Sequence, residues 1–140
     1  MANEITVTAA DVRPAPDAHI EKLPTAEAAI TAGQAVYIHG TAGTNLALAT
    51  TTIADATNRL AGVAVKGAAI GEIVEAILLG KLHGFSALTP GTCYVLSEDV
   101  AGGIKPYANI ASGDFQGIIG HAYNATTMLV NIQDTLALKP

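Results

Sequence analysis

Short apolar runs separated by glycines mark most of this chain. From Ala28 onward the runs are rich in Val, Ile, Leu, Thr and Tyr. Short runs of this composition between glycine turns are typical of β-strands. A single helical turn at residues 53–59 is left open, because Asp55 is a suitable N-cap. We expect strands at residues 35–39, 46–51, 60–65, 72–79, 81–85, 92–96, 103–107, 115–123 and 127–133.

An internal repeat organises these expected strands. Residues 30–38 match residues 88–96, and residues 60–65 match residues 118–123, both at a spacing of 58 positions. Two matches at one spacing indicate a duplicated β-unit, although a glycine before a hairpin is common in any β-protein. Neither copy is large enough to bury its apolar face alone. We therefore expect the two copies to close on each other as a barrel or sandwich with pseudo-twofold symmetry.

The predicted fold class is all-β: a small barrel or sandwich built from a duplicated β-unit, preceded by an extended N-terminal arm. The arm covers residues 1–25 and the body residues 26–140, with pseudo-repeats at about 30–82 and 88–133. Six glycines are expected to occupy structural turns, because they stand between apolar runs. These turn glycines are Gly33, Gly62, Gly71, Gly80, Gly91 and Gly120.

The N-terminal arm is richer in proline and charge than the body. Pro14, Pro16 and Pro24 each remove a backbone donor, which argues against core sheet. Residues 5–8 alternate β-branched side chains and predict one short strand, whereas residues 11–17 predict extended, polyproline-like chain. A free tail without a partner is the alternative to a docking arm.

Such an arm can add a strand to the exposed sheet edge of another protein. Removal of residues 1–16 is then expected to weaken attachment without unfolding the body. The side chains expected to make the contact with a capsid or a neighbouring subunit are Ile5, Val7, Val12, Arg13, Pro14 and Pro16.

Composition narrows the class of function. Only 14% of residues are charged, and a surface so poor in charge is typical of proteins covered by partners. The net charge is −5 and the seven basic residues are scattered singly, which argues against nucleic-acid binding. No run of 18 apolar residues predicts a membrane span, and the N-terminus lacks the pattern of a signal peptide. We expect synthesis in the cytoplasm and no membrane association.

Candidate catalytic and metal-binding residues each have an ordinary structural explanation. The four histidines and Cys93 lack the spacing of zinc ligands, and Cys93 stands in an apolar run where a thiol acts as a small hydrophobic group. The pair Glu72 and Glu75 points to opposite faces of a strand, and residues 98–99 adjoin the turn expected at residues 102–103. Residues 40–44 lack the lysine of a phosphate loop. We therefore expect no catalytic residue, metal or cofactor.

Three segments carry a resemblance to a known family. They are Gly-x-x-Val-Tyr-Ile at 33–38, Leu-Ala-Gly-Val-Ala-Val at 60–65, and Gly-x-Ile-Val-Glu-Ala-Ile-Leu-Leu-Gly-Lys-Leu at 71–82. Together with the repeat they resemble the capsid decoration, or cement, proteins of tailed phages, over about residues 30–132. The resemblance implies a barrel or β-tulip-like body, a homotrimer, and a place on the outside of the virion. It further implies binding to the major capsid protein and an arm that reaches over capsid subunits.

Two other functions stay open. A phage fibre or host-recognition module that binds glycan is suggested by the Thr- and Gly-rich residues 41–45, although the aromatic platform that sugars usually need is absent from the sequence. A small hydrolase is supported only by acids and histidines without an assigned role. Location on the tail favours the first of these, and a dense polar constellation around one pocket favours the second.

Overall fold

The described part of the chain is an all-β structure. A computed structural model of the 140-residue chain describes residues 5–26, 28–39, 45–48, 60–97, 102–109, 115–116, 118–132 and 137–138. Most of these residues form a nearly closed, mainly antiparallel sheet, with two short 3₁₀ segments, η1 (Ala9–Asp11) and η2 (Tyr107–Asn109). The predicted all-β barrel class is confirmed. The described residues contain no helix that is long and apolar enough to cross a membrane.

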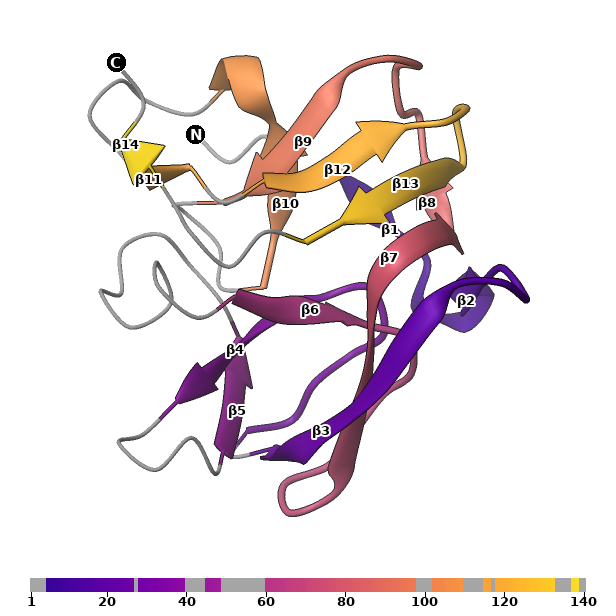
Figure 1. The fold of residues 1–140 in the computed structure, drawn as a ribbon. Helices are drawn as coiled ribbons and strands as arrows, with labels where there is room; N and C mark the ends of the chain where they lie inside the picture. Colours follow the sequence, from indigo (N-terminus) through magenta and orange to yellow (C-terminus); the bar gives the residue numbers. More distant parts are fainter. Residues whose placement is uncertain are drawn as a thin grey trace.

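One long strand, β7 (Ile73–His83), runs through both halves of the molecule (Figure 1). The sequence predicted two strands here, at 72–79 and 81–85, with Gly80 as a turn, and this prediction was wrong. Gly80 continues the strand because both of its neighbours stay paired: Leu79 with Asn131 and Lys81 with Leu129. The two halves of the molecule therefore share a rigid β-strand rather than a linker.

The first half is a small barrel, which we call the first barrel. Its strands are joined in the order β7–β3–β5–β4–β6, and β6 then pairs with β7 again, which closes the ring. All neighbours are antiparallel except β3 and β5. It occupies the lower part of Figure 1. Besides the first part of β7, its strands are β3 (His19–Ala26), β4 (Ala35–His39), β5 (Asn45–Leu48) and β6 (Leu60–Ala64).

The second half, the second barrel, uses the last part of β7. Its sheet follows the order β7–β13–β12–β9–β10 and occupies the upper part of Figure 1. A two-stranded sheet, β1 (Thr6–Val7) with β8 (Phe85–Ser86), lies beside it. The other strands are β9 (Cys93–Leu96), β10 (Ile104–Pro106), β12 (Ile118–Ala122) and β13 (Thr127–Asn131). Two further pairings involve β2 (Arg13–Pro14) with β7, and β11 (Phe115–Gln116) with β14 (Ala137–Leu138).

Backbone hydrogen bonds of the two barrels recur at a spacing of 58 residues. The Gly33 N–H donates to the Ala64 carbonyl at 2.8 Å, and the Gly91 N–H donates to the Ala122 carbonyl at 3.0 Å. Both glycines have positive φ, +92° and +82°. A glycine in the left-handed region lets the chain reverse direction here. The strand after the glycine can then pair with the strand that contains the bonded alanine.

Strand register recurs at the same spacing. Val36 pairs with Gly62 in the first barrel and Tyr94 pairs with Gly120 in the second, and a bulge follows each pair. The pairing of β4 with β5 is repeated by that of β9 with β10. The two barrels thus share one pattern of backbone hydrogen bonds, although their side chains differ.

Two apolar clusters form the core. The larger contains residues of both barrels and the aromatic side chains Tyr37, Phe85 and Tyr94, so the barrels pack on each other rather than standing apart. The smaller cluster lies within the first barrel and is mostly alanine, which lets its strands approach closely. Its members are Ala26, Ile30, Val36, Ala61, Ala64, Ala68, Val74 and Ala76.

Strand β3 corrects the expectation that residues 1–25 contain no core sheet. It pairs with β7 from His19 to Thr25, so the predicted boundary between arm and body falls inside a strand. Pro24 is accommodated because the register shifts between Leu23 and Thr25. At such an irregularity no ladder bond is needed from the proline nitrogen.

Three of the six expected turn glycines are not in turns. Gly33, Gly71 and Gly91 lie in turns, but Gly62, Gly80 and Gly120 lie inside β6, β7 and β12. Their role is close approach: a Cβ added to Gly62 or Gly120 would collide with the carbonyl oxygen of the paired strand. The helical turn at 53–59 and the loop at 41–44 lie outside the described residues.

Candidate interaction surface

The N-terminal segment lies on its own body. The Ile5 N–H donates to the Ile104 carbonyl of β10 at 2.8 Å, and Val7 of β1 pairs with Phe85 of β8. Strand β1 thus fills the gap between β8 and β10, two strands that do not pair directly. Ile5, Val7 and Val12 are half-buried and pack against the larger cluster. These three arm side chains, which the sequence assigned to contact with a capsid or a neighbouring subunit, pack on the second barrel of their own chain.

Glycines of the body make room for this segment. A Cβ at Gly33 would collide with the Val7 side chain, and a Cβ at Gly84 would stand 2.7 Å from the Val12 Cα. Gly84 also has a positive φ of +112°. Only glycine provides both the backbone conformation and the space. The glycine positions of the body are therefore matched to the course of the N-terminal segment.

The remaining arm residues differ in exposure. Pro14 pairs with Leu82 of β7 and is half-buried. Arg13 is exposed, and its guanidinium donates a long hydrogen bond of 3.4 Å to the Asp11 carbonyl. Pro16 is exposed in the turn that leads to β3. Of the six predicted contact residues, only Arg13 and Pro16 present their side chains to solvent.

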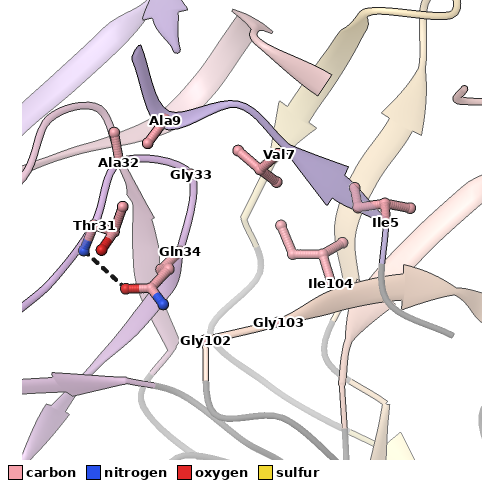
Figure 2. Close-up of a pocket in the computed structure, with 10 residues that line it drawn as sticks. All are labelled: Ile5, Val7, Ala9, Thr31, Ala32, Gly33, Gln34, Gly102, Gly103 and Ile104. Carbon is pink, nitrogen blue, oxygen red and sulfur yellow. Dashed lines mark hydrogen bonds between the residues drawn. The ribbon is translucent and has the colours of Figure 1, made fainter. Parts of the chain in front are cut away.

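A cavity of about 260 Å³ lies where the N-terminal segment meets the turn before β4 (Figure 2). Ile5, Val7 and Ile104 line one side, and the turn of residues 31–34 lines the other. Two of its polar lining residues bond to each other, because the Gln34 Oε1 accepts a hydrogen bond from the Thr31 N–H at 2.8 Å. The cavity is a mainly apolar gap between segment and body, and offers no convergent polar groups for catalysis.

A second, more polar cleft is also lined by residues of the N-terminal segment. Its volume is about 350 Å³, and Asp11, Arg13 and His83 are among its lining residues. The His83 Nδ1 is 2.8 Å from the Thr127 hydroxyl, a buried side chain that this bond satisfies. The imidazole thus joins β7 to β13, a structural role that explains its position.

Other candidates for chemistry lie apart. Among the described residues no group of three or more His, Cys, Asp or Glu side chains is placed to hold a metal ion. Cys93 is half-buried, and burial raises the pKa of its thiol, which disfavours the reactive thiolate. The Glu75 carboxylate pairs with Lys66, and this hydrogen bond and charge lower the pKa of Glu75. Residues 98–99 lie outside the described residues.

Exposed large apolar side chains gather in two places that the sequence did not single out. The first, which we call the tip, is the end of the turn between β6 and β7, with Ile70 in the turn and Ile73 at the start of β7. The second, which we call the face patch, is the outer surface of β7 and β13 with Leu79 and Leu129, joined by Tyr123 in the turn between β12 and β13. These five are the large apolar side chains that are exposed among those whose exposure the structure describes.

No known protein family and no curated protein matches this sequence. What the chain does must therefore be argued from its own residues and surfaces.

The face patch also carries a cation. Lys81 pairs with Leu129 in the sheet, and its Nζ lies 4.0 Å from the centre of the Tyr123 ring. Such a cation–π contact holds the ammonium over an apolar surface. One signal in the sequence could have revealed the patch: residues 128–130 are a continuous apolar run, which is typical of a strand covered on both faces. Alternation alone does not say which face a partner covers.

Proposed function

We propose that this chain is a structural virion protein that binds the outside of a phage capsid and stabilises it by bridging capsid subunits. The proposal takes a homotrimer as the acting form and the major capsid protein as the partner. It requires no cofactor and no catalytic residue. The observation that carries it is a double barrel with a shared strand, on which the exposed large apolar side chains that the structure describes lie in two patches.

The physical case concerns rigidity. A cement protein must transmit force between the subunits that it joins, and two barrels that share β7 and one apolar cluster provide a stiff connection. Patches of exposed apolar residues on an otherwise polar surface mark sites of protein contact. Many copies on a symmetric shell then add weak contacts into strong attachment.

The role proposed for the arm changes with its position. Ile5, Val7, Val12 and Pro14 hold the segment on the body, so removal of residues 1–16 is now expected to destabilise the second barrel. We assign the arm's contact with the capsid to Arg13 and Pro16, because these two side chains are exposed. Exchanging both for alanine is expected to weaken shell attachment without lowering the melting temperature of the isolated chain. The matched control is Thr6→Ser, an exposed position on the same segment.

The test of the function is shell stability. Particles assembled with and without the chain are heated, and the temperature of genome release is followed with a nucleic-acid dye. We expect the decorated particles to withstand a higher temperature. Equal release temperatures at full occupancy contradict cementing, and image reconstruction that places the chain on the tail instead supports the fibre module.

A further inference from the structure

The polar cleft of about 350 Å³ is built from parts of the chain that are far apart in sequence. Residues 8–13 of the N-terminal segment form one part, the end of β7 with β8 forms another, and the turn between β12 and β13 contributes Thr126. Its volume lies within the range of about 300 to 1,000 Å³ that is usual for small-molecule sites. The fold thus creates a cleft of suitable size that no local pattern marks.

Most side chains that line this cleft are polar and have hydrogen-bonding capacity to spare. Thr8, Asp11, Arg13 and Ser86 are exposed. Within the described part of the chain, the hydroxyls of Thr8 and Ser86 and the carboxylate of Asp11 have no protein hydrogen-bond partner. The Arg13 guanidinium has five N–H donors and donates a long bond of 3.4 Å to the Asp11 carbonyl. A ligand therefore meets both donors and acceptors.

His83 adds a group that is already held in place. Its Nδ1 lies 2.8 Å from the hydroxyl of Thr127, a residue outside the lining of the cleft. Nε2 is therefore the ring nitrogen that is left for a ligand, as a donor or an acceptor according to the tautomer. Because the Thr127 bond fixes the ring, ligand binding costs little side-chain ordering at this position.

The mixture of groups selects the class of ligand. The Asp11 carboxylate repels a phosphate or a carboxylate, and the Arg13 guanidinium repels a metal ion or an ammonium group. Among the described lining residues only Gly84 and Phe85 lack a polar side chain, and Phe85 is 3% exposed, so an apolar ligand gains little. A sugar hydroxyl both donates and accepts, and can bond to each of these polar groups.

We infer that this cleft binds one unit of a neutral saccharide. The Asp11 carboxylate accepts hydrogen bonds from sugar hydroxyls, while Ser86 and the Nε2 of His83 bond to others. These residues are distinct from residues 41–45, whose composition suggested glycan binding in the sequence. The inference goes beyond the proposed function and does not depend on it. Because Arg13 is also assigned to the capsid, the variants that test the saccharide leave it unchanged.

Chemical shifts of the isotope-labelled, purified chain test the site. The probes are the methyl glycosides of glucose, galactose and mannose, with glucuronate, inorganic phosphate and a short glycine–serine peptide for comparison. At least one neutral glycoside is expected to shift the amide signals of Gly84, Ser86 and Thr126, with saturation at millimolar concentrations. Larger shifts with the neutral glycoside than with either anion or the peptide identify the ligand class.

Two variants connect these shifts to the named groups. Asp11→Asn is expected to weaken binding of the glycoside about tenfold and Ser86→Ala about fivefold, because each removes one bonding group and leaves the backbone in place. The matched controls are Asp17→Asn and Thr89→Ala, which remove the same kinds of group from exposed positions outside the cleft. Circular dichroism verifies that every variant is folded.

Three results overturn the inference: no neutral glycoside shifts the cleft signals, only an anion or the peptide does, or both cleft variants bind as well as their controls. These results are separate from the test of cementing, because no shell is present. A chain that binds the glycoside but does not protect shells retains this site and loses the proposed function. A chain that protects shells but binds no glycoside does the reverse.

Discussion

The two barrels share a pattern of backbone bonds but close in different ways. In the first barrel, β3 pairs directly with β5, so the ring is complete within its own strands. In the second, β8 and β10 stand apart, and β1 enters between them through the Ile5–Ile104 hydrogen bond and the Val7–Phe85 pair. A duplicated unit thus leaves one opening, and the segment that precedes the duplication fills it.

The difference has a physical reason. An open barrel exposes unpaired N–H and C=O groups and an apolar interior, both of which cost free energy. The first barrel avoids this with a strand that comes directly before its own repeat. In the second barrel, the last part of β7 pairs with β13 and covers one edge of the sheet, and β1 is needed to cover the other edge. The second barrel should therefore be the one whose stability depends on the N-terminus.

The largest effect is expected from removing the apolar contacts of β1. Ile5→Ser with Val7→Ser should lower the free energy of unfolding by about 2 to 4 kcal/mol, because two half-buried aliphatic side chains are lost. Hydrogen exchange should accelerate at β8 and β10 more than at β4 and β6. Thr6→Ser, the exposed position between them, is the control. Equal acceleration in both barrels contradicts the comparison.

A smaller effect is expected at the matched glycines Gly33 and Gly91. Both have positive φ, so an alanine at either costs about 1 to 2 kcal/mol in urea unfolding. Gly91 faces open space, whereas a Cβ at Gly33 collides with Val7. Gly33→Ala should therefore cost about 1 kcal/mol more than Gly91→Ala.

The excess at Gly33 tests whether β1 is docked in solution. In the background Val7→Ala the colliding methyl group is gone, so the difference between Gly33→Ala and Gly91→Ala should shrink towards zero. A difference that persists in that background means that Gly33 is strained for another reason.

The smallest effect concerns acid. The Lys66–Glu75 pair belongs to the first barrel, and at the corresponding positions the second has Asn124 and Thr127. Lys66 lowers the pKa of Glu75 from its ordinary 4.5, so the pair contributes stability above that pH and loses it as pH falls through the lowered pKa. Acid should therefore speed hydrogen exchange near β6 and the start of β7 before it affects β12 and β13. Glu75→Gln should abolish that difference, and a difference that survives the change assigns it to another group.

Local pattern was sufficient for part of the fold. Glycine-bounded runs predicted most strands of the body, and the spacing of 58 residues reappears in the hydrogen bonds of Gly33 and Gly91. Local pattern gave the wrong prediction at Gly80, because glycine is typical of turns, and at Pro24, because proline is rare in sheets. Both residues lie in strands. In both cases the deciding factor is a strand distant in sequence, which composition does not record.

The sequence by itself determined the all-β class and the duplicated pattern of backbone bonds, because the composition of short runs and the placement of glycines act over a few residues. Only the tertiary structure decided that Ile5 and Val7 point into their own body, that β7 joins the two barrels, and that Leu129 faces solvent while Ile77, which pairs at the matching position of the first barrel, is buried. These outcomes depend on which sheet edges and faces meet, and such long-range pairing is settled by packing across the whole molecule.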